Sequence, residues 1–239
     1  MSDLNKKYMK NSGVLSLRRV FPALFAACFS LLLLMPGQAS AAAKTPQQWS
    51  TAVQKRYAGF NSLQATFGQL ITHGESGVSE ERGGTISFRK PLLVRWATNP
   101  PAEELLVVTD KEIWQYIPDE ELAYKYPLAA MDDKNAFLRV LFGLSSLADS
   151  FRITVLPGED GFAKLQLDPH EPSMSLMQAT IWLEEDSATI RRILIRDFYG
   201  NRNQVQLNGI KFNVAVPESD FTFTPPPRTE VEDQTVMPE

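Results

Sequence analysis

The residues that could support catalysis are few and lie far apart in the chain. The only two histidines, His73 and His170, occupy the turn-like stretches HGESG and DPHEP. Distant side chains can still meet in a folded active site. Neither histidine lies near a nucleophile motif, however, and GLSSL at Gly143–Leu147 lacks the G-x-S-x-G form. The sequence also has no H-E-x-x-H zinc motif, no P-loop and no G-x-G-x-x-G motif. We therefore expect no catalytic residues, no metal site and no cofactor.

Acidic side chains cluster at two points, Asp119–Glu121 and Glu184–Asp186. Both clusters fall between predicted strands, where solvated turn residues are the ordinary explanation. Without residues 1–43 the chain keeps 19 Lys and Arg against 27 Asp and Glu, a net charge of −8. Nucleic-acid binding depends on clustered cations that contact phosphates. The charge balance therefore predicts that nucleic acid is not a partner.

Residues 1–43 have the pattern of a cleaved secretory signal peptide. A basic segment up to Arg19 precedes the apolar run Val20–Met35, and small residues allow cleavage after Ala43 or Ala41. A transmembrane anchor is the alternative, but this run is shorter than the about 20 residues that a spanning helix needs. A lipoprotein signal ending at Cys28 is a second alternative, and it would leave FSLLLLM on the mature chain. Export without any remaining cysteine predicts a fold without disulfides.

The chain after the signal peptide predicts one helix followed by many short strands. Thr45 is suited to the N-cap and Pro46 to the first turn, and Gly59 ends the helix. A short amphipathic helix is predicted at Asp133–Phe142. Strands are predicted at 61–73, Gly84–Arg89, Leu92–Thr98, Glu104–Thr109, Ile113–Ile117, Phe151–Leu156, Gly161–Leu167, Met177–Glu184, Ile190–Asp197, Asn203–Ile210 and Phe221–Thr224.

Short connections between these strands are typical of an antiparallel meander. We therefore expect a mainly β (α+β) fold of about ten to eleven strands, bent strongly and covered on one side by helices. No repeat or internal linker divides the chain, so residues 44–239 are predicted to form a single domain. The polar tail 228–239 is expected to be loose.

Large apolar side chains recur on the predicted strands and helices. Each of them could simply pack in a core. Together, on a bent sheet under thin helices, they could also line an apolar cavity, which is a common site for a ligand. Acyl chains suit such a lining, because they need no hydrogen-bond partner and gain about 0.8 kcal/mol per buried CH₂. The candidate lining residues are Val53, Ile86, Phe88, Val94, Trp96, Trp114, Phe137, Leu138, Leu141, Phe142 and Trp182.

Four stretches carry a resemblance to a known family. They are SLQATFGQ at Ser62–Gln69, GGTISFRKPLLVRW at Gly83–Trp96, EELLVVTDKEIWQYIPD at Glu103–Asp119 and FTFTPPPRTEVEDQ at Phe221–Gln234. In this order they resemble the periplasmic outer-membrane lipoprotein carrier family, LolA. The resemblance covers essentially the whole mature chain.

The resemblance implies an unclosed antiparallel half-barrel with a lid of short helices over an apolar cavity. It also implies a monomeric periplasmic carrier without enzymatic activity. Such a carrier takes acylated lipoproteins from an ATP-driven inner-membrane releasing complex and passes them to an outer-membrane receptor. The receptor itself is an alternative, because it has the same fold. It is a lipoprotein with a cysteine directly after the cleavage site, and Cys28 is badly placed for that role. An enzyme on the same scaffold is a weaker alternative.

The resemblance further implies a latch between sheet and lid. Family members have an arginine directly before the proline of this motif, and here Lys90 precedes Pro91 while Arg89 lies one residue earlier. Lys90 and Arg89 are therefore the candidate latch residues. An ammonium group lacks the fork of donors of a guanidinium. Arg89 could take the arginine's place only if a bulge reversed its direction, because neighbouring strand residues face opposite ways. The family also tends to have an aromatic residue where Val94 stands.

Overall fold

The computed structural model describes residues 43–129 and 146–235, which belong to one compact unit that begins at Ala43. The predicted signal peptide and the predicted helix Asp133–Phe142 lie outside the described residues. Within the described ranges, no helix has the length and apolar character required to cross a bilayer.

Helix α1 (Pro46–Ala58) begins and ends at the predicted residues. The hydroxyl of Thr45 accepts a hydrogen bond from the Gln48 amide at 3.3 Å, and the Gln48 side chain accepts one from the Thr45 amide at 2.8 Å. This reciprocal capping box satisfies two amides that the helix itself leaves without partners. Three other short helices are described: η1 (Pro118–Glu120), α4 (Leu147–Ser150) and η2 (Glu218–Phe221).

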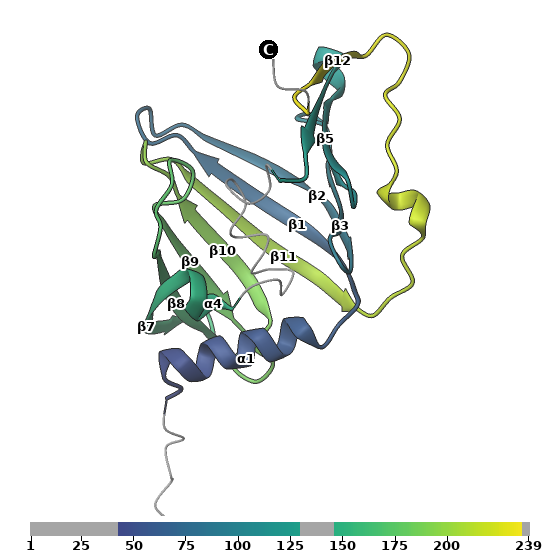
Figure 1. Ribbon diagram of the computed structural model, residues 1–239. Coiled ribbons are helices and arrows are strands. Elements are labelled where there is room, and N and C mark those ends of the chain that lie inside the picture. The colour runs from purple at the N-terminus through teal and green to yellow at the C-terminus, as the bar shows by residue number, and fades with distance from the viewer. Residues whose placement is uncertain (1–42, 130–145, 236–239) are drawn as a thin grey trace, which may run out of the picture. The chain divides into compact units, whose positions relative to one another are not determined.

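The strands form one twelve-stranded sheet with the order β12-β6-β5-β4-β3-β2-β1-β11-β10-β9-β8-β7 (Figure 1). All neighbouring strands pair antiparallel except β12 and β6, which are parallel. The sheet does not close, since β7 and β12 are its two edges. This confirms the predicted mainly β, unclosed fold. The strand bounds are β1 (Ser62–Thr72), β2 (Ser79–Arg89), β3 (Leu93–Thr98), β4 (Glu104–Val108), β5 (Glu112–Ile117), β6 (Leu122–Pro127), β7 (Phe151–Glu159), β8 (Phe162–Pro169), β9 (Gln178–Leu183), β10 (Ile190–Arg196), β11 (Arg202–Phe212) and β12 (Glu230–Asp233).

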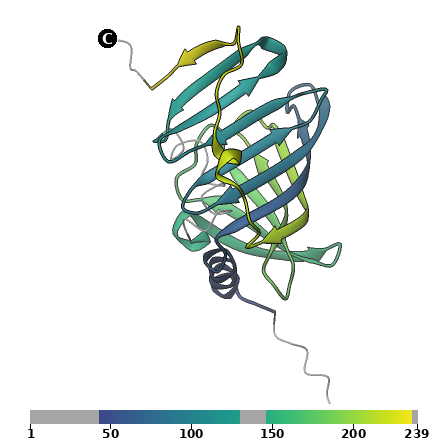
Figure 2. The same cartoon turned by 90° about the vertical axis from the view of Figure 1, so that its right-hand side faces the viewer.

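Alternation along the strands gives the sheet two different faces. The inner face carries the core: Leu63 lies opposite Phe88, and Phe88 in turn lies opposite Val94. The buried side of α1, including Val53 and Tyr57, belongs to the same core cluster. Figures 1 and 2 show that the sheet is strongly bent and that α1 crosses one end of it.

Two predictions for the C-terminal part were wrong. The strand expected at Phe221–Thr224 does not form, because η2 ends at Phe221 and this side chain is buried. A strand forms instead at Glu230–Asp233, within the tail that was expected to be loose, and it pairs with β6. Strand β6 itself was not predicted. Lys125 contributes to this pairing, because its ammonium lies 2.9 Å from Glu112 and 3.8 Å from Asp233.

The segment 213–229 crosses the outer face of the sheet over the early strands (Figure 2). Hydrogen bonds to its carbonyl groups help to hold it there: Ser62 donates to the Val214 carbonyl at 2.6 Å, Arg89 to the Val216 carbonyl at 3.3 Å, and Arg95 to the Asp220 carbonyl at 3.4 Å. Two of the three cations around Pro91 thus attach the C-terminal segment to the sheet.

Candidate functional site

The inner face carries apolar side chains that the core leaves partly exposed. Trp96 lies opposite Leu106 on β4, and its ring packs against Phe67 with centroids 4.5 Å apart. On the other half of the sheet, Ile195 lies opposite the buried Ala179 of β9. The partly buried strand residues packed against the core include Trp96, Leu106, Tyr126, Ile153 and Ile195. Both halves of the bent sheet therefore present apolar surface on the same face.

The predicted lining residues separate into groups. Val53, Ile86, Phe88 and Val94 face inward, as the strand and helix patterns indicate, but at most 2% of each is exposed. In this conformation they form core rather than open lining. Of the predicted set, Trp96 alone among the described residues is on the inner face and partly exposed. Phe137, Leu138, Leu141 and Phe142 lie outside the described residues.

Trp114 was expected in the lining and lies instead on the outer face. Its neighbour Ile113 faces the core, so Trp114 points the other way and packs against Phe223 with centroids 5.4 Å apart. Tyr116 contacts the same ring at 5.4 Å. Trp114 therefore helps hold the C-terminal segment and does not share a face with Val94.

Trp182 was also expected in the lining, and it too lies on the outer face. Its strand neighbours Ile181 and Leu183 belong to the core cluster, which places Trp182 opposite to them. The cationic groups of Lys164 and Arg192, one from each neighbouring strand, both lie 5.0 Å from its ring centroid. This arrangement stacks two cations on one indole, and such contacts stabilise a sheet surface.

Lys90 connects the sheet to α1. Its ammonium donates a hydrogen bond of 2.8 Å to the carbonyl oxygen of Ala58, the last residue of the helix. It also lies 5.4 Å from the centroid of the Phe60 ring. Within the described residues the cation before Pro91 thus contacts the end of α1, and its latch contact with the lid stays a prediction.

Arg89 faces the other way. The pairing of β2 with both neighbours continues without a bulge to this residue, so nothing reverses its direction. Its guanidinium binds the Val216 carbonyl and lies 3.8 Å from Glu218 and 5.3 Å from the Phe221 ring. Arg89 therefore holds the C-terminal segment, and the latch role expected for it is not supported.

A buried hydrogen bond that the sequence analysis missed also anchors α1. The hydroxyl of Tyr57 accepts a hydrogen bond of 3.0 Å from the Ile190 amide at the start of β10. Burial raises the pKa of the Tyr57 phenol far above its usual range, so this group stays neutral. Spacing identified Tyr57 as a core residue of the helix, but its polar partner lies 133 positions further along the chain.

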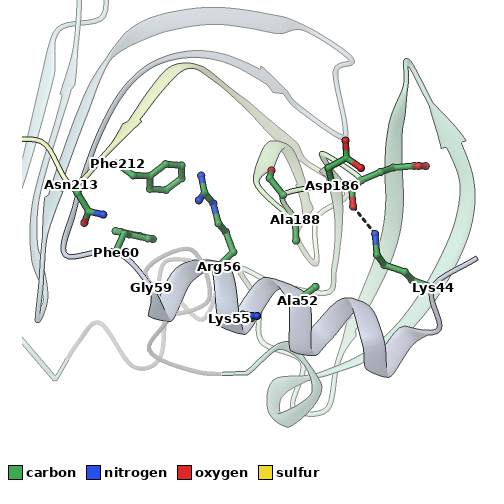
Figure 3. Close-up of a pocket in the computed structure, with 12 residues that line it drawn as sticks. Lys44, Ala52, Lys55, Arg56, Gly59, Phe60, Asp186, Ala188, Phe212 and Asn213 are labelled. Atoms are coloured by element: carbon green, nitrogen blue, oxygen red, sulfur yellow. Dashed lines mark hydrogen bonds between the residues drawn. The ribbon is translucent and has the colours of Figure 1, made fainter.

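A pocket of about 410 Å³ lies beside α1, between the helix and the β9–β10 turn (Figure 3). Lys44 donates a hydrogen bond of 2.5 Å to the Glu185 carbonyl at one end of it. Arg56 reaches the Thr189 hydroxyl at 3.0 Å and lies 3.8 Å from the Phe212 ring centroid. These contacts fix α1 to the sheet along its length, together with Tyr57 and Lys90.

The described residues offer no site for metal chemistry. No group of three or more His, Cys, Asp or Glu side chains in residues 43–129 and 146–235 could hold a metal ion. His73 lies in the turn between β1 and β2, and His170 follows β8, where it contacts the Ala148 carbonyl at 3.3 Å.

An open antiparallel sheet with a helix across one end and an apolar inner face defines a class of half-barrel binding proteins. Residues 58–224 match the family model described as "Outer membrane lipoprotein carrier protein LolA". The chain therefore belongs to the LolA family. The role of this family is that of a carrier, not of an enzyme, and carriers of outer-membrane lipoproteins act in the periplasm.

Individual relatives agree with this assignment. The outer-membrane lipoprotein carrier protein of Bordetella pertussis is 28% identical over 198 residues, which covers 81% of this chain and 92% of the relative. The protein of the same name from Pseudomonas aeruginosa is 29% identical over 185 residues, 76% of this chain and 88% of the relative. Among solved structures, an uncharacterized conserved protein from Thermus thermophilus superimposes with a TM-score of 0.53 at 15% identity, over 80% of this chain and 100% of that one. That likeness supports the fold alone.

Proposed function

We propose that this protein carries outer-membrane lipoproteins through the periplasm by binding their acyl chains on the inner face of its sheet. The observation that supports this most directly is the apolar surface that remains partly exposed around Trp96 and Ile195 in a chain of the LolA family. Each methylene that moves from water to this face contributes about 0.8 kcal/mol. Acyl chains have no polar groups that the face would leave without partners.

The cargo would come from an ATP-driven releasing complex in the inner membrane and pass to a receptor in the outer membrane. Residues 1–43 would act as a signal peptide that is cleaved on export, and the mature protein 44–239 would act as a monomer without cofactor. These steps follow from the family resemblance and from the pattern of the N-terminal segment.

Loading requires the core to yield space, because Val94, Phe88 and Ile86 are buried in this conformation. Helix α1 is held by Lys90 and Tyr57 at its C-terminal end, so movement there breaks specific polar contacts. The helix predicted at Asp133–Phe142 would supply the rest of the lid. Bound cargo would then stabilise an open conformation of the protein, which is only a minor conformation in the absence of cargo.

Two tryptophan variants test the binding face. Trp96→Ala removes inner-face surface, whereas Trp114→Ala removes a similar ring from the outer face. A fluorescent apolar probe bound to the purified protein should be displaced by an acylated peptide and not by the same peptide without its acyl chain. Trp96→Ala should bind the acylated peptide at least about tenfold more weakly, since an aromatic ring contributes well over 1 kcal/mol. Trp114→Ala should bind like the wild type. Equal displacement by both peptides would contradict acyl binding.

The carrier role itself is tested by release. Inner membranes, ATP and the releasing complex are incubated with the protein, and the soluble fraction is examined for lipoprotein. We expect a soluble complex of one lipoprotein and one carrier. If the protein binds acylated peptide but lipoproteins stay in the membrane, the protein binds acyl chains without acting as a carrier.

A further inference from the structure

Three turns at the end of the sheet away from α1 are joined into one surface (Figure 1). We call residues 73–78, 170–177 and 197–201 the loop rim. The Gly74 amide donates to the Asn201 side chain at 2.8 Å, and the Phe198 amide to the Met174 carbonyl at 3.0 Å. These two bonds link turn 73–78 and turn 170–177 to turn 197–201. The rim is therefore one connected surface and not three independent loops.

Large apolar side chains gather on the loop rim and are exposed there. Phe198 is 59% and Tyr199 is 68% exposed, and their rings pack edge to face at 5.6 Å. Five of the seven large apolar side chains that are exposed among the described residues belong to the rim: Val78, Met174, Met177, Phe198 and Tyr199. An exposed apolar cluster of this kind marks an interaction surface more often than chance.

A pair of arginines lies directly beside this cluster. Arg196 on β10 and Arg202 on β11 are directly opposite each other, and Gln178 lies opposite Arg196 on the other side. Like charges in this position destabilise a sheet. Neither arginine has an ion-pair partner in the described parts of the chain. The carboxylate of Asp197 nearby is occupied by the amide and side chain of Asn201, at 2.8 and 2.7 Å.

Arg196, Arg202 and His73 line one pocket of about 490 Å³ together with the exposed Met177. Guanidinium groups bind phosphate oxygens in a two-pronged geometry, and two of them side by side fit a single anionic headgroup. Asp197 and Gly200 also line this pocket, and Phe198 and Tyr199 lie between them in the chain. Aromatic rings prefer the headgroup level of a bilayer.

We propose that the loop rim is a docking surface for a bilayer of anionic phospholipids. Arg196 and Arg202 bind the lipid phosphates, and Phe198 with its neighbours enters the headgroup region. Two arginines without ion-pair partners beside exposed aromatic rings are complementary to an anionic lipid surface, whereas Glu75, Glu171 and Asp197 of the rim and the net charge of −8 outside the first 43 residues oppose its approach. Such a chain needs a local positive site to approach an anionic surface.

Flotation with vesicles tests the proposal, using the purified protein and vesicles of phosphatidylglycerol and phosphatidylcholine (1:1) or of phosphatidylcholine alone. The wild type should float with the anionic vesicles, and less at high salt. R196Q/R202Q should lower the partition coefficient for anionic vesicles roughly tenfold. F198S/Y199S should lower it for both kinds of vesicle. K111Q/R228Q removes two exposed cations elsewhere, one in the β4–β5 turn and one in the C-terminal segment, and serves as the control with the same change in net charge.

The control should stay within about twofold of the wild type, since surface charge far from the rim is largely screened. The proposal would be overturned if the wild type did not float with anionic vesicles. It would also be overturned if R196Q/R202Q bound these vesicles as strongly as the wild type. A dimer in sedimentation that F198S/Y199S dissociates would assign the rim to a second copy of the chain and would also overturn it.

The rim lies on other residues than the proposed acyl face, so the two proposals fail separately. Acylated peptide should displace the apolar probe from the rim variants as readily as from the wild type. A variant that loses vesicle binding but keeps acyl binding therefore reports on docking alone. Circular dichroism shows whether each variant is folded.

Discussion

The ammonium group of Lys90 lies 2.8 Å from the carbonyl oxygen of Ala58 and donates a hydrogen bond to it. Ala58 is the last residue of α1, where helix carbonyls lack partners within the helix and the dipole favours a cation. Lys90 comes directly after β2, so one side chain joins the bend of the sheet to the end of the helix. We therefore expect a change in the bend of the sheet to act on the end of α1 through this hydrogen bond.

Lys90→Leu removes this hydrogen bond and keeps the apolar part of the side chain. We expect the amides of the last turn of α1 to exchange with solvent about two- to tenfold faster, in line with a lost hydrogen bond of about 0.5–1.5 kcal/mol. Acceptance of lipoprotein should remain, while hand-over to the receptor should slow. Lys90→Arg keeps a hydrogen-bond donor, so these amides should exchange at about the wild-type rate. Unchanged exchange and unchanged transfer in Lys90→Leu would show that Lys90 is only a solvated cation.

Tyr57→Phe leaves the buried amide of Ile190 without its acceptor. A buried donor that loses its partner costs about 1–3 kcal/mol. Urea unfolding should show a loss of this size in the free energy of unfolding. Tyr199→Phe removes an exposed hydroxyl and should change the free energy by less than about 0.5 kcal/mol. Equal effects of the two variants would mean that the Tyr57 hydrogen bond adds nothing to stability.

Val94→Phe tests whether the core near Trp96 has free space. Val94 is fully buried between Phe88 and Val108, so an added ring overpacks the core and should cost about 1–3 kcal/mol. Thermal unfolding measures this loss, and Val78→Phe at an exposed position is the control. A variant of undiminished stability that binds acylated peptide more tightly would show that cargo already has room at this residue.

Asp168 predicts a pH dependence of stability. Hydrogen bonds from Gln178 at 2.9 Å and from Gln166 at 3.2 Å, with Arg152 nearby, lower the pKa of this carboxyl group although burial opposes them. A lowered folded-state pKa stabilises the protein above the unfolded value of about 3.9, and this contribution is lost as pH falls through the folded-state pKa. Asp168→Asn should cost about 1 kcal/mol at pH 7.

The difference between Asp168→Asn and the wild type should shrink in urea unfolding as the pH falls below about 4. Asp110→Asn, in an exposed turn, should stay within about 0.5 kcal/mol of the wild type at pH 7. A difference for Asp168→Asn that is the same at pH 7 and at pH 2 would contradict the role assigned to its charge.

Local patterns were sufficient for most elements of the sheet and for α1. Thr45, Pro46 and Gly59 act within one turn of the helix, so its ends could be predicted from neighbouring residues. Alternation along the predicted strand Ile113–Ile117 requires Ile113 and Trp114 to lie on opposite faces, and they do. It could not indicate that the outer face would also be covered, because Phe223 comes from a segment more than one hundred residues away. Trp114 was assigned to the wrong face for this reason.

Strand β12 depends on the same kind of distant information. Glu230–Asp233 is acidic and exposed, and it forms a strand because β6 offers an edge and Lys125 a counter-charge. Neither feature is visible in the tail itself. The candidate latch shows the reverse case: the family resemblance pointed to the residue before Pro91, and the direction of Arg89 followed only from the uninterrupted register of β2.

The central claim is that acyl chains bind to the inner face of the sheet, and cross-linking tests it most directly. A lipopeptide with a photoactivatable group at the end of its acyl chain is bound to the protein, irradiated and mapped by mass spectrometry. We expect adducts on inner-face residues such as Trp96, Leu106 and Ile195, which an excess of unlabelled acylated peptide suppresses. Adducts on the outer-face residues Trp114 and Phe223, or adducts that the competitor does not reduce, would contradict the account.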